Sequence, residues 1–410
     1  MIAIPFIYFT GYFVYIYKKN GLDVAAYMAF LYALTGFFSI ILSNTNLEYA
    51  AREVTFVPTF LYCILITSCI SPFVSLRLNK KIFNEYNINM KIFDFLSYFY
   101  IVSFLFSLIL FWDDMVFRLT FADFKEMRGA DDFFMQTAQA KLSGPLRILS
   151  SIFGIFNSMS WIVLLLFFYS ICFLQKQIWF NSLLLLSSTS CIILGIIGID
   201  RSIVFYWLLL LGFSFILFYK YIPEKKKKWI FISFSILVGL LLLYFIAVTM
   251  SRFGDDGSDK EGAFDSIIEY AGQNFINFCW FWDRLNLPNV DLSGLFPAIN
   301  HFFIGDPSVV EYGKKLELKL GFFINYFYTF LGSWMIYVGQ LGTLILVIVY
   351  SISARKLLRC KQYVSLGTFM RIFIIGIVPA CGVILYKYTS YMVTTSALLL
   401  FILSFYVSKK

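Results

Sequence analysis

The sequence predicts an all-α protein, a polytopic helical membrane protein with about eleven transmembrane helices. Its composition is the first observation, because 60% of its 410 residues are hydrophobic and only 14% are charged. Water-soluble globular chains of this length do not have such values. The second observation is that apolar stretches close to the roughly 20 residues needed to cross a bilayer recur from end to end. These stretches lack the alternation of barrel strands, so we expect helices.

Each expected span is one apolar stretch bounded by charged or turn-forming residues. In chain order, the expected spans are 2–17, 24–43, 56–76, 92–112, 148–174, 178–199, 203–221, 230–250, 334–353, 364–386 and 390–407. Lys18 and Lys19 follow the first apolar run instead of preceding it. This order argues against a cleaved signal peptide and indicates that the first span enters with its N-terminus outside.

The basic residues set the orientation of the other spans. If Lys18 and Lys19 are cytoplasmic, the same side collects most of the short basic connections, including Lys225–Lys228. Acidic residues then predominate on the outer side. We therefore expect the C-terminus in the cytoplasm. The net charge of +9 reflects this topology, so we expect no nucleic-acid partner.

The connections predict one integral membrane domain over residues 1–410, with two long outer loops at 113–147 and 251–333. Long ordered loops are usually functional. In the second loop, apolar residues recur at helical spacing, which predicts an amphipathic helix near 263–286. Two positions for this helix stay open. It lies in the membrane interface, where the rings of "FCWFWD" at 278–283 prefer to be, or it packs over the helix bundle as a lid, and neither position excludes the other.

The familiar sequence motifs of soluble enzymes are missing. The chain has no P-loop, no HExxH, no GxSxG and no cluster of cysteines and histidines, so we expect neither a metal nor a cofactor. Its outer loops are instead rich in cations near membrane level. These are Arg118, Arg128, Arg147, Arg201, Arg252, Arg284, Lys314, Lys315 and Lys319, together with His301. Guanidinium groups bind phosphate bidentately, so a membrane lipid with a phosphate or diphosphate headgroup fits this pattern.

The stretch "GIDRS" at 198–202 places Asp200 and Arg201 between two long apolar runs. The charge pattern puts this stretch on the outer face, as the tight corner between the sixth and seventh spans. Two interpretations are equally open. The two side chains pair with each other, or Arg201 contacts an anionic ligand.

Four short segments resemble Wzy-type oligosaccharide repeat-unit polymerases. The first is "INYFYTFLGSWMIYVGQLGTLI" at 324–345, where Asn325, Phe327, Thr329, Gly332, Gly339 and Gly342 match the family's pattern. The others are "SIIEYAGQNFINF" at 266–278, "GIDRS" at 198–202 and "MRG" at 127–129. The sequence departs from the family at Val338, where an acidic residue is common. The plan of about a dozen spans with two large outer loops covers the whole chain.

The resemblance implies a bacterial inner-membrane enzyme whose active site faces the periplasm. Such a glycosyltransferase polymerises undecaprenyl-diphosphate-linked oligosaccharide repeat units into O-antigen or capsular polysaccharide. Its partners are that lipid-linked oligosaccharide and membrane lipid, and a chain-length regulator protein stays open as a further partner. The lipid diphosphate is the leaving group, so the resemblance implies no cofactor.

We assign roles to candidate residues on this basis. Arginines suited to stabilise charge on the diphosphate are Arg201, Arg128, Arg252 and Arg284. Candidates for the catalytic group that activates the acceptor hydroxyl are His301, Asp265 and Glu269. Candidates for sugar binding are Tyr270, Trp280, Trp282 and Asn325. For His301, a packed loop residue is the competing interpretation.

Three other classes of protein stay open. An O-antigen ligase would carry the same loops and arginines and would differ in its acceptor. A flippase for lipid-linked oligosaccharides would need charges that line a central cavity, and the spans contain few charged residues. A membrane scaffold without enzymatic activity would not explain cations gathered at one membrane level.

Overall fold

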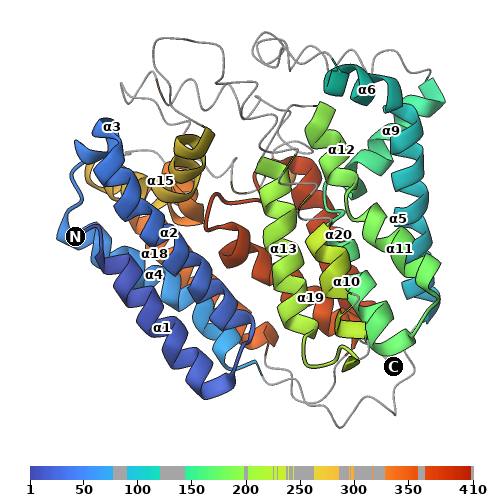
Figure 1. Ribbon diagram of the computed structural model, residues 1–410, viewed down its shortest axis with the longest axis horizontal. Coiled ribbons are helices and arrows are strands. Elements are labelled where there is room, and N and C mark those ends of the chain that lie inside the picture. Colours follow the sequence, from blue (N-terminus) through green and yellow to red (C-terminus); the bar gives the residue numbers. More distant parts are fainter. Residues whose placement is uncertain are drawn as a thin grey trace. The chain divides into compact units, whose positions relative to one another are not determined.

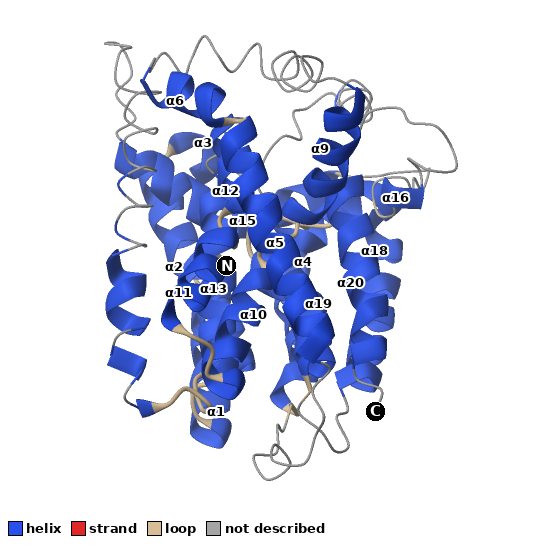
Figure 2. Cartoon of the chain, turned by 90° about the vertical axis from the view of Figure 1, so that its right-hand side faces the viewer, coloured by secondary structure: helices blue, strands red, loops and turns tan. Residues whose placement is uncertain are grey.

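The computed structural model describes residues 1–76, 90–120, 144–197, 202–224, 226–228, 230–236, 239, 243, 263–285, 295, 297–299, 317, 328–358 and 365–407. Within these ranges every regular element is a helix (Figure 2). The one backbone pairing of strand type in these ranges is an isolated bridge between Thr329 and Leu385. The predicted all-helical class is therefore confirmed for this part of the chain.

The helices have the following bounds (Figure 1): α1 Ile4–Asn20, α2 Val24–Thr45, α3 Leu47–Ala50, α4 Phe56–Val74, α5 Met90–Leu110, α6 Trp112–Thr120, α9 Gly144–Asn157, α10 Ile162–Tyr169, the π-helix Ser170–Leu174, α11 Ile178–Ser187, α12 Ser190–Ile197, α13 Ser202–Phe218, α15 Ala263–Arg284, α16 Pro297–Ile299, α18 Thr329–Leu358, α19 Leu366–Cys381 and α20 Tyr391–Val407.

Several of these helices are suited to a membrane. Four described helices, α2, α4, α5 and α18, are long and apolar enough to cross a bilayer. The pair α9 and Ile162–Leu174 also passes this test, although it is bent by 68°. Four further helical stretches of 10–17 residues are apolar. These helices indicate a membrane-embedded protein, whereas the number of eleven spans and their orientation stay predictions.

Four predicted spans differ from the helices observed, and one of these, 334–353, contains the break of α18 at Gly339. The expected span at 148–174 is broken between α9 and α10, and the expected span at 178–199 divides into α11 and α12. The expected span at 364–386 ends as a helix at Cys381. Hydropathy identifies apolar segments, but it does not indicate where the backbone departs from the helical conformation.

The chain divides into two compact units. The first consists of Met1–Tyr86, Ile267–Val364 and Ile374–Leu398, and the second of Asn87–Ser266, Ser365–Phe373 and Leu399–Lys410. The order of apolar stretches does not indicate this division. The expectation of one integral membrane domain stays a prediction.

In the first unit, α1 and α2 form a closely packed hairpin (Figure 1). A Cβ atom at Gly36 would lie 2.8 Å from the backbone nitrogen of Phe6, so glycine is needed at this crossing. Asp23 caps α2 by accepting a hydrogen bond of 2.8 Å from the amide of Ala26. Such a cap satisfies one of the amides that a helix start leaves without a partner.

Helix α18 supplies hydroxyl groups to two helices that contain proline. Pro72 in α4 has no N–H, which deprives the carbonyl of Ser68 of its helical partner, and Ser351 donates to this carbonyl at 2.9 Å. Pro379 in α19 likewise frees the carbonyl of Ile375, which accepts from the Tyr350 hydroxyl at 2.9 Å. Two consecutive residues of α18 therefore hold α4 and α19.

The first turn of α18 is bonded to the segment that follows α19. The amide of Thr329 donates to the carbonyl of Ile384, and the amide of Phe330 donates to that of Gly382, both at 2.9 Å. Inside α18 the helix is interrupted at Gly339, whose φ is 71°. A side chain rarely tolerates this φ, so glycine permits the break.

In the second unit, the two segments at which helices are interrupted are joined by hydrogen bonds. The hydroxyl of Ser160, between α9 and α10, accepts from the amide of Cys191 at 3.0 Å and donates to the carbonyl of Ser188 at 3.1 Å. Asn157, which is 1% exposed, bonds two serines of α5, Ser103 and Ser107, at 2.8 Å each. Broken helices persist in an apolar surrounding when their backbone groups find such partners.

We predict that Tyr350→Phe and Ser351→Ala each destabilise the protein. Tyr350→Phe removes the hydroxyl that donates to the carbonyl of Ile375, which costs about 1–3 kcal/mol of the free energy of unfolding. Ser351→Ala is expected to cost less, because the Ser71 hydroxyl also donates to the carbonyl of Ser68, at 2.9 Å. Thermal unfolding of the purified protein in detergent measures the loss. Tyr17→Phe removes a hydroxyl from a half-exposed tyrosine of α1 and serves as the control. Equal midpoints for Tyr350→Phe and this control would contradict the assignment.

Candidate functional site

The candidate site begins at the short connection between α2 and α4. The side chain of Asn46 accepts a hydrogen bond of 2.9 Å from the amide of Glu48 and so starts the single-turn helix α3. Asn and Asp favour such positions because their side chains bond nearby backbone amides. This turn places Tyr49 and Arg52 against α15.

The other wall of the site is α15, which packs closely against α2. A Cβ atom at Gly272 would lie 2.5 Å from the carbonyl oxygen of Phe38, so only glycine permits this approach. Ser39 reinforces the contact by donating to the carbonyl of Gly272 at 2.6 Å. On α4, the Tyr62 ring lies 5.0 Å from that of Phe275 and 5.4 Å from that of Phe278, measured between centroids. This packing agrees with the predicted lid, while the position of the helix in the membrane interface stays a prediction.

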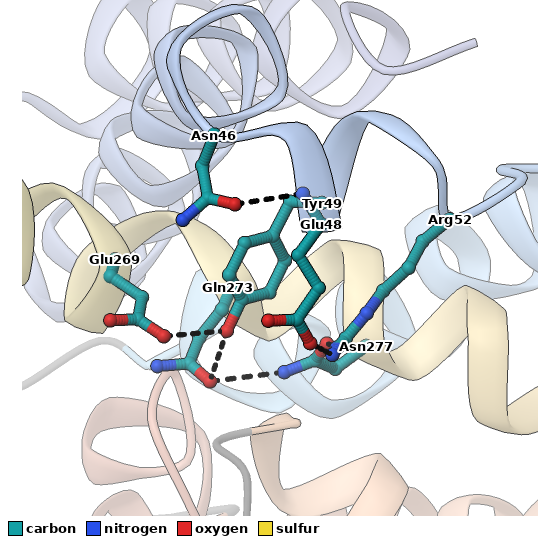
Figure 3. Close-up of polar contacts among 7 residues, drawn as sticks. All are labelled: Asn46, Glu48, Tyr49, Arg52, Glu269, Gln273 and Asn277. Atoms are coloured by element: carbon teal, nitrogen blue, oxygen red, sulfur yellow. Dashed lines mark hydrogen bonds and ion pairs between the residues drawn. The ribbon is translucent and has the colours of Figure 1, made fainter. Parts of the chain in front are cut away.

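Between α3 and α15 a continuous chain of hydrogen bonds forms, which we call the α3–α15 cluster (Figure 3). The Tyr49 hydroxyl lies 2.8 Å from Glu269 Oε1, to which it donates, and 3.3 Å from Gln273 Oε1. The same Gln273 oxygen accepts from Asn277 Nδ2 at 3.1 Å. The chain continues to Arg52, which donates to Asn277 Oδ1 and to the carboxylate of Glu48. The cluster thus runs from one carboxylate to another.

The middle of the cluster is buried and its ends are accessible. Asn277 is 0% exposed and the Arg52 side chain 7%, whereas the Glu48 side chain is 61% exposed and Glu269 is half-buried. A buried guanidinium destabilises a fold unless acceptors surround it. Here the carboxylate of Glu48 and the amide oxygen of Asn277 are those acceptors, and the carboxylate neutralises the charge of Arg52.

Tyr49 stays a hydrogen-bond donor at neutral pH. Burial raises the pKa of its hydroxyl, and the adjacent Glu269 carboxylate raises this pKa further, because a phenolate would lose hydration and meet a like charge. The Tyr49 proton therefore points to Glu269 and fixes the orientation of that carboxylate.

Aromatic rings and a second arginine extend the cluster toward the C-terminal end of α15. The Arg52 guanidinium carbon lies 4.5 Å from the centroid of the Tyr49 ring and 5.0 Å from that of the Trp280 ring. The Arg284 guanidinium carbon lies 4.6 Å from the Trp280 centroid. All three distances are within the range of cation–π attraction. Asp283 is exposed and accepts from the Thr55 hydroxyl at 2.8 Å, which links this end of α15 to the start of α4.

Several residues singled out in the sequence lie in or beside this cluster. Glu269 and Trp280 are half-buried and Arg284 is exposed, all along one helix. Tyr270 is half-buried on the same helix. Trp282 is 8% exposed and packs against the ring of Phe278, and its carbonyl accepts from Gln340 of α18. The structure therefore places Trp282 in the packing of the first unit.

Other candidates lie outside the described residues. These are His301, Arg128, Arg201, Arg252 and Asn325, and Asp265 belongs to α15 with its side chain likewise outside the description. Their predicted roles stay predictions. Within the part of the chain that is described, no group of three His, Cys, Asp or Glu residues is placed to hold a metal ion.

Five cluster residues were missed in the sequence: Glu48, Tyr49, Arg52, Gln273 and Asn277. For the amides a signal existed, because Glu269, Gln273 and Asn277 recur at intervals of four and so share one face of a helix. Arg52 gave a weaker signal, a single cation in a short connection. Its partner on α15 is 225 residues away in the sequence, a distance over which a pattern does not reveal pairing.

Comparison of the chain with protein-family models, with curated proteins and with solved structures found no match. The site is therefore interpreted from its own chemistry. It offers carboxylates oriented by buried donors, half-buried aromatic rings and an exposed guanidinium on the segment predicted to face outward. Such groups are suited to bind and orient a ligand rich in hydroxyl groups.

We predict that Arg52 and Asn277 are energetically coupled. Arg52→Met or Asn277→Leu alone removes one hydrogen-bond partner of a buried polar group, the Asn277 amide or the Arg52 guanidinium, and lowers the free energy of unfolding by about 1.5–3 kcal/mol. The double variant loses less than the sum of the two single losses, by about 0.5–3 kcal/mol. Chemical unfolding in mixed micelles measures all three variants.

Arg284→Met serves as the control for this coupling, since it removes an arginine that is exposed beside the same ring. It is expected to change stability by less than about 0.5 kcal/mol. Strict additivity of the Arg52 and Asn277 variants would contradict a direct bond between these residues.

Proposed function

We propose that the protein is a membrane-embedded glycosyltransferase that polymerises oligosaccharide repeat units carried on a lipid diphosphate. In this proposal the chain crosses the bacterial inner membrane with about eleven spans, and its two long loops face the periplasm. The reaction transfers a growing glycan from its lipid diphosphate to a sugar hydroxyl of another lipid-linked unit. The lipid diphosphate leaves, and the acceptor hydroxyl loses its proton.

One observation supports this proposal above the others. A protein built of apolar helices keeps two arginines, three carboxylates and a tryptophan in and around one cluster between α3 and α15. Burying the charge of Arg52 costs free energy, and a charge is retained in such a place chiefly where it is paired or serves a function. The cluster lies on segments that the charge pattern places outside, and its α15 part belongs to the second long loop, which includes one of the segments that resemble the polymerase family.

The chemistry requires two tasks, and the chain has candidates for both. Charge that develops on the leaving diphosphate needs preorganised cations, and Arg128, Arg201, Arg252 and Arg284 are the predicted contacts. The acceptor hydroxyl needs a base within hydrogen-bond reach. Glu269 suits this task because Tyr49 fixes its carboxylate while the side chain is only half-buried.

Replacement of Arg201 tests the proposal in cells. We expect Arg201→Ala to abolish the ladder of long surface polysaccharide on a gel, because the leaving group loses a stabilising cation. Lys356→Ala is the control. It removes an exposed cation from the last turn of α18, a segment predicted to face the cytoplasm, and is expected to keep the ladder. A normal ladder from correctly inserted Arg201→Ala protein would contradict a role for this arginine.

Replacement of Glu269 tests the assignment of the base in vitro. With purified lipid-diphosphate-linked oligosaccharide, Glu269→Gln is expected to lower kcat by about 10²–10⁴-fold, the usual contribution of a general base. Glu53→Gln changes an exposed carboxylate near α3 and is the matched control. A kcat of Glu269→Gln equal to that of the control would refute the role.

The acceptor used in the same assay separates two enzyme classes. A polymerase extends a lipid-diphosphate-linked oligosaccharide, whereas a ligase transfers the glycan to a lipid A core acceptor. We expect products only with the first acceptor. Products only with the second would assign the protein to the ligase class.

A further inference from the structure

We infer that the α3–α15 cluster binds the neutral, hydroxyl-rich part of a glycan and disfavours the lipid diphosphate. This inference rests on the proposed function, because it assigns one part of the proposed substrate to one place on the protein. The face meant is formed by Glu48, Glu269, Trp280, Asp283 and Arg284, which are all half-buried or exposed. The buried members of the cluster orient the side chains of this face. They are Tyr49, Arg52, Gln273 and Asn277.

The charges of this face decide against a diphosphate. Glu48, Glu269 and Asp283 bring three carboxylates, and the guanidinium of Arg52 is buried and already bonded to one of them. Among the described residues, Arg284 is the one cation that this face exposes, and it follows Asp283 directly in the chain. A diphosphate would meet more like charges than opposite ones, so Coulomb repulsion disfavours it.

The same groups match the chemistry of sugars. An ionised carboxylate only accepts hydrogen bonds, and a sugar hydroxyl can donate one without bringing a charge. Glu48 offers 61% of its side chain to such donors, and Tyr49 fixes Glu269 through a hydrogen bond of 2.8 Å. Neutral hydroxyl groups therefore donate hydrogen bonds to the carboxylates of this face, whereas ionised phosphate oxygens have no proton to donate.

Trp280 supplies the flat apolar surface on which the C–H face of a sugar ring packs. Its ring is braced by the buried Arg52, whose guanidinium carbon lies 5.0 Å from the centroid. Arg284 also lies against this ring, at 4.6 Å, but its side chain is exposed and has many rotamers. A sugar can therefore approach the indole while Arg284 turns its N–H donors to the sugar oxygens.

The glycan face changes the roles assigned to three residues. Arg284 moves from the predicted diphosphate contacts to the glycan face, and the diphosphate is assigned to the other predicted arginines, Arg128, Arg201 and Arg252. Glu48 and Trp280 become residues that determine which glycan is accepted. Neither Glu48 nor Trp280 has a role in stabilising the charge on the leaving diphosphate.

Binding of carrier-free probes tests the inference with the full-length protein in lipid nanodiscs. One probe set is a panel of methyl glycosides of neutral hexoses and N-acetylhexosamines, followed by saturation-transfer difference NMR. The other probe is geranyl diphosphate, followed by calorimetry. We expect at least one glycoside to bind, with affinity lowered about tenfold by Glu48→Gln and by Trp280→Ala, which corresponds to about 1.4 kcal/mol.

Matched variants keep the result separate from misfolding. Trp280→Phe retains an aromatic face and is expected to restore most of the glycoside affinity, and Glu53→Gln is expected to leave it unchanged. Affinity for geranyl diphosphate is expected to stay within about twofold of the unsubstituted protein in Glu48→Gln and Trp280→Ala. A thermal midpoint measured for each variant identifies any that fails to fold.

Three outcomes would overturn the inference. They are no binding by any glycoside, glycoside binding that is indifferent to both Glu48→Gln and Trp280→Ala, or loss of geranyl diphosphate binding on replacement of Trp280. Failure of the proposed function is recognised separately. A protein that binds glycosides through Trp280 but forms no product from lipid-diphosphate-linked oligosaccharide supports the glycan face and refutes the polymerase.

Discussion

The first unit depends on one constraint, which is that a backbone carbonyl without a partner is costly in apolar surroundings. Pro72 and Pro379 each free such a carbonyl, and adjacent residues of α18, Ser351 and Tyr350, provide the donors. Tyr32 of α2 donates to the carbonyl of Pro379 itself at 3.0 Å. Through these bonds α18 fixes α4 and α19, and α4 continues the chain from the turn that carries Arg52.

The α3–α15 cluster follows from this arrangement. Once α2 and α4 are fixed, α15 packs against them at Gly272 and around the ring of Tyr62. Its remaining side then faces α3, where polar side chains meet the buried guanidinium of Arg52. A charge buried in this way needs acceptors on both walls, which explains why polar residues occur on a helix that is otherwise covered by apolar neighbours.

The charges of the cluster also connect the proposed chemistry with the glycan face. A neutralised Arg52 stabilises the negative charges near it without attracting an anionic ligand, while Tyr49 keeps Glu269 oriented. A glycosyl transfer needs its acceptor hydroxyl oriented separately from its leaving group, because the two groups differ in charge and need opposite surroundings. A carboxylate-rich face suits the former, and arginines suit the latter.

Local pattern was sufficient to predict the helical class, the membrane character and a helix that carries Glu269, Trp280 and Arg284, because hydropathy and helical spacing are properties of neighbouring residues. It could not predict the breaks near Ser160 and Gly339, because apolar composition continues across them. It also could not pair Arg52 with Asn277, or assign Tyr350 to a carbonyl freed by Pro379. Such partners lie far apart in the chain, and they meet only when the packed helices leave each polar group a single place to bond.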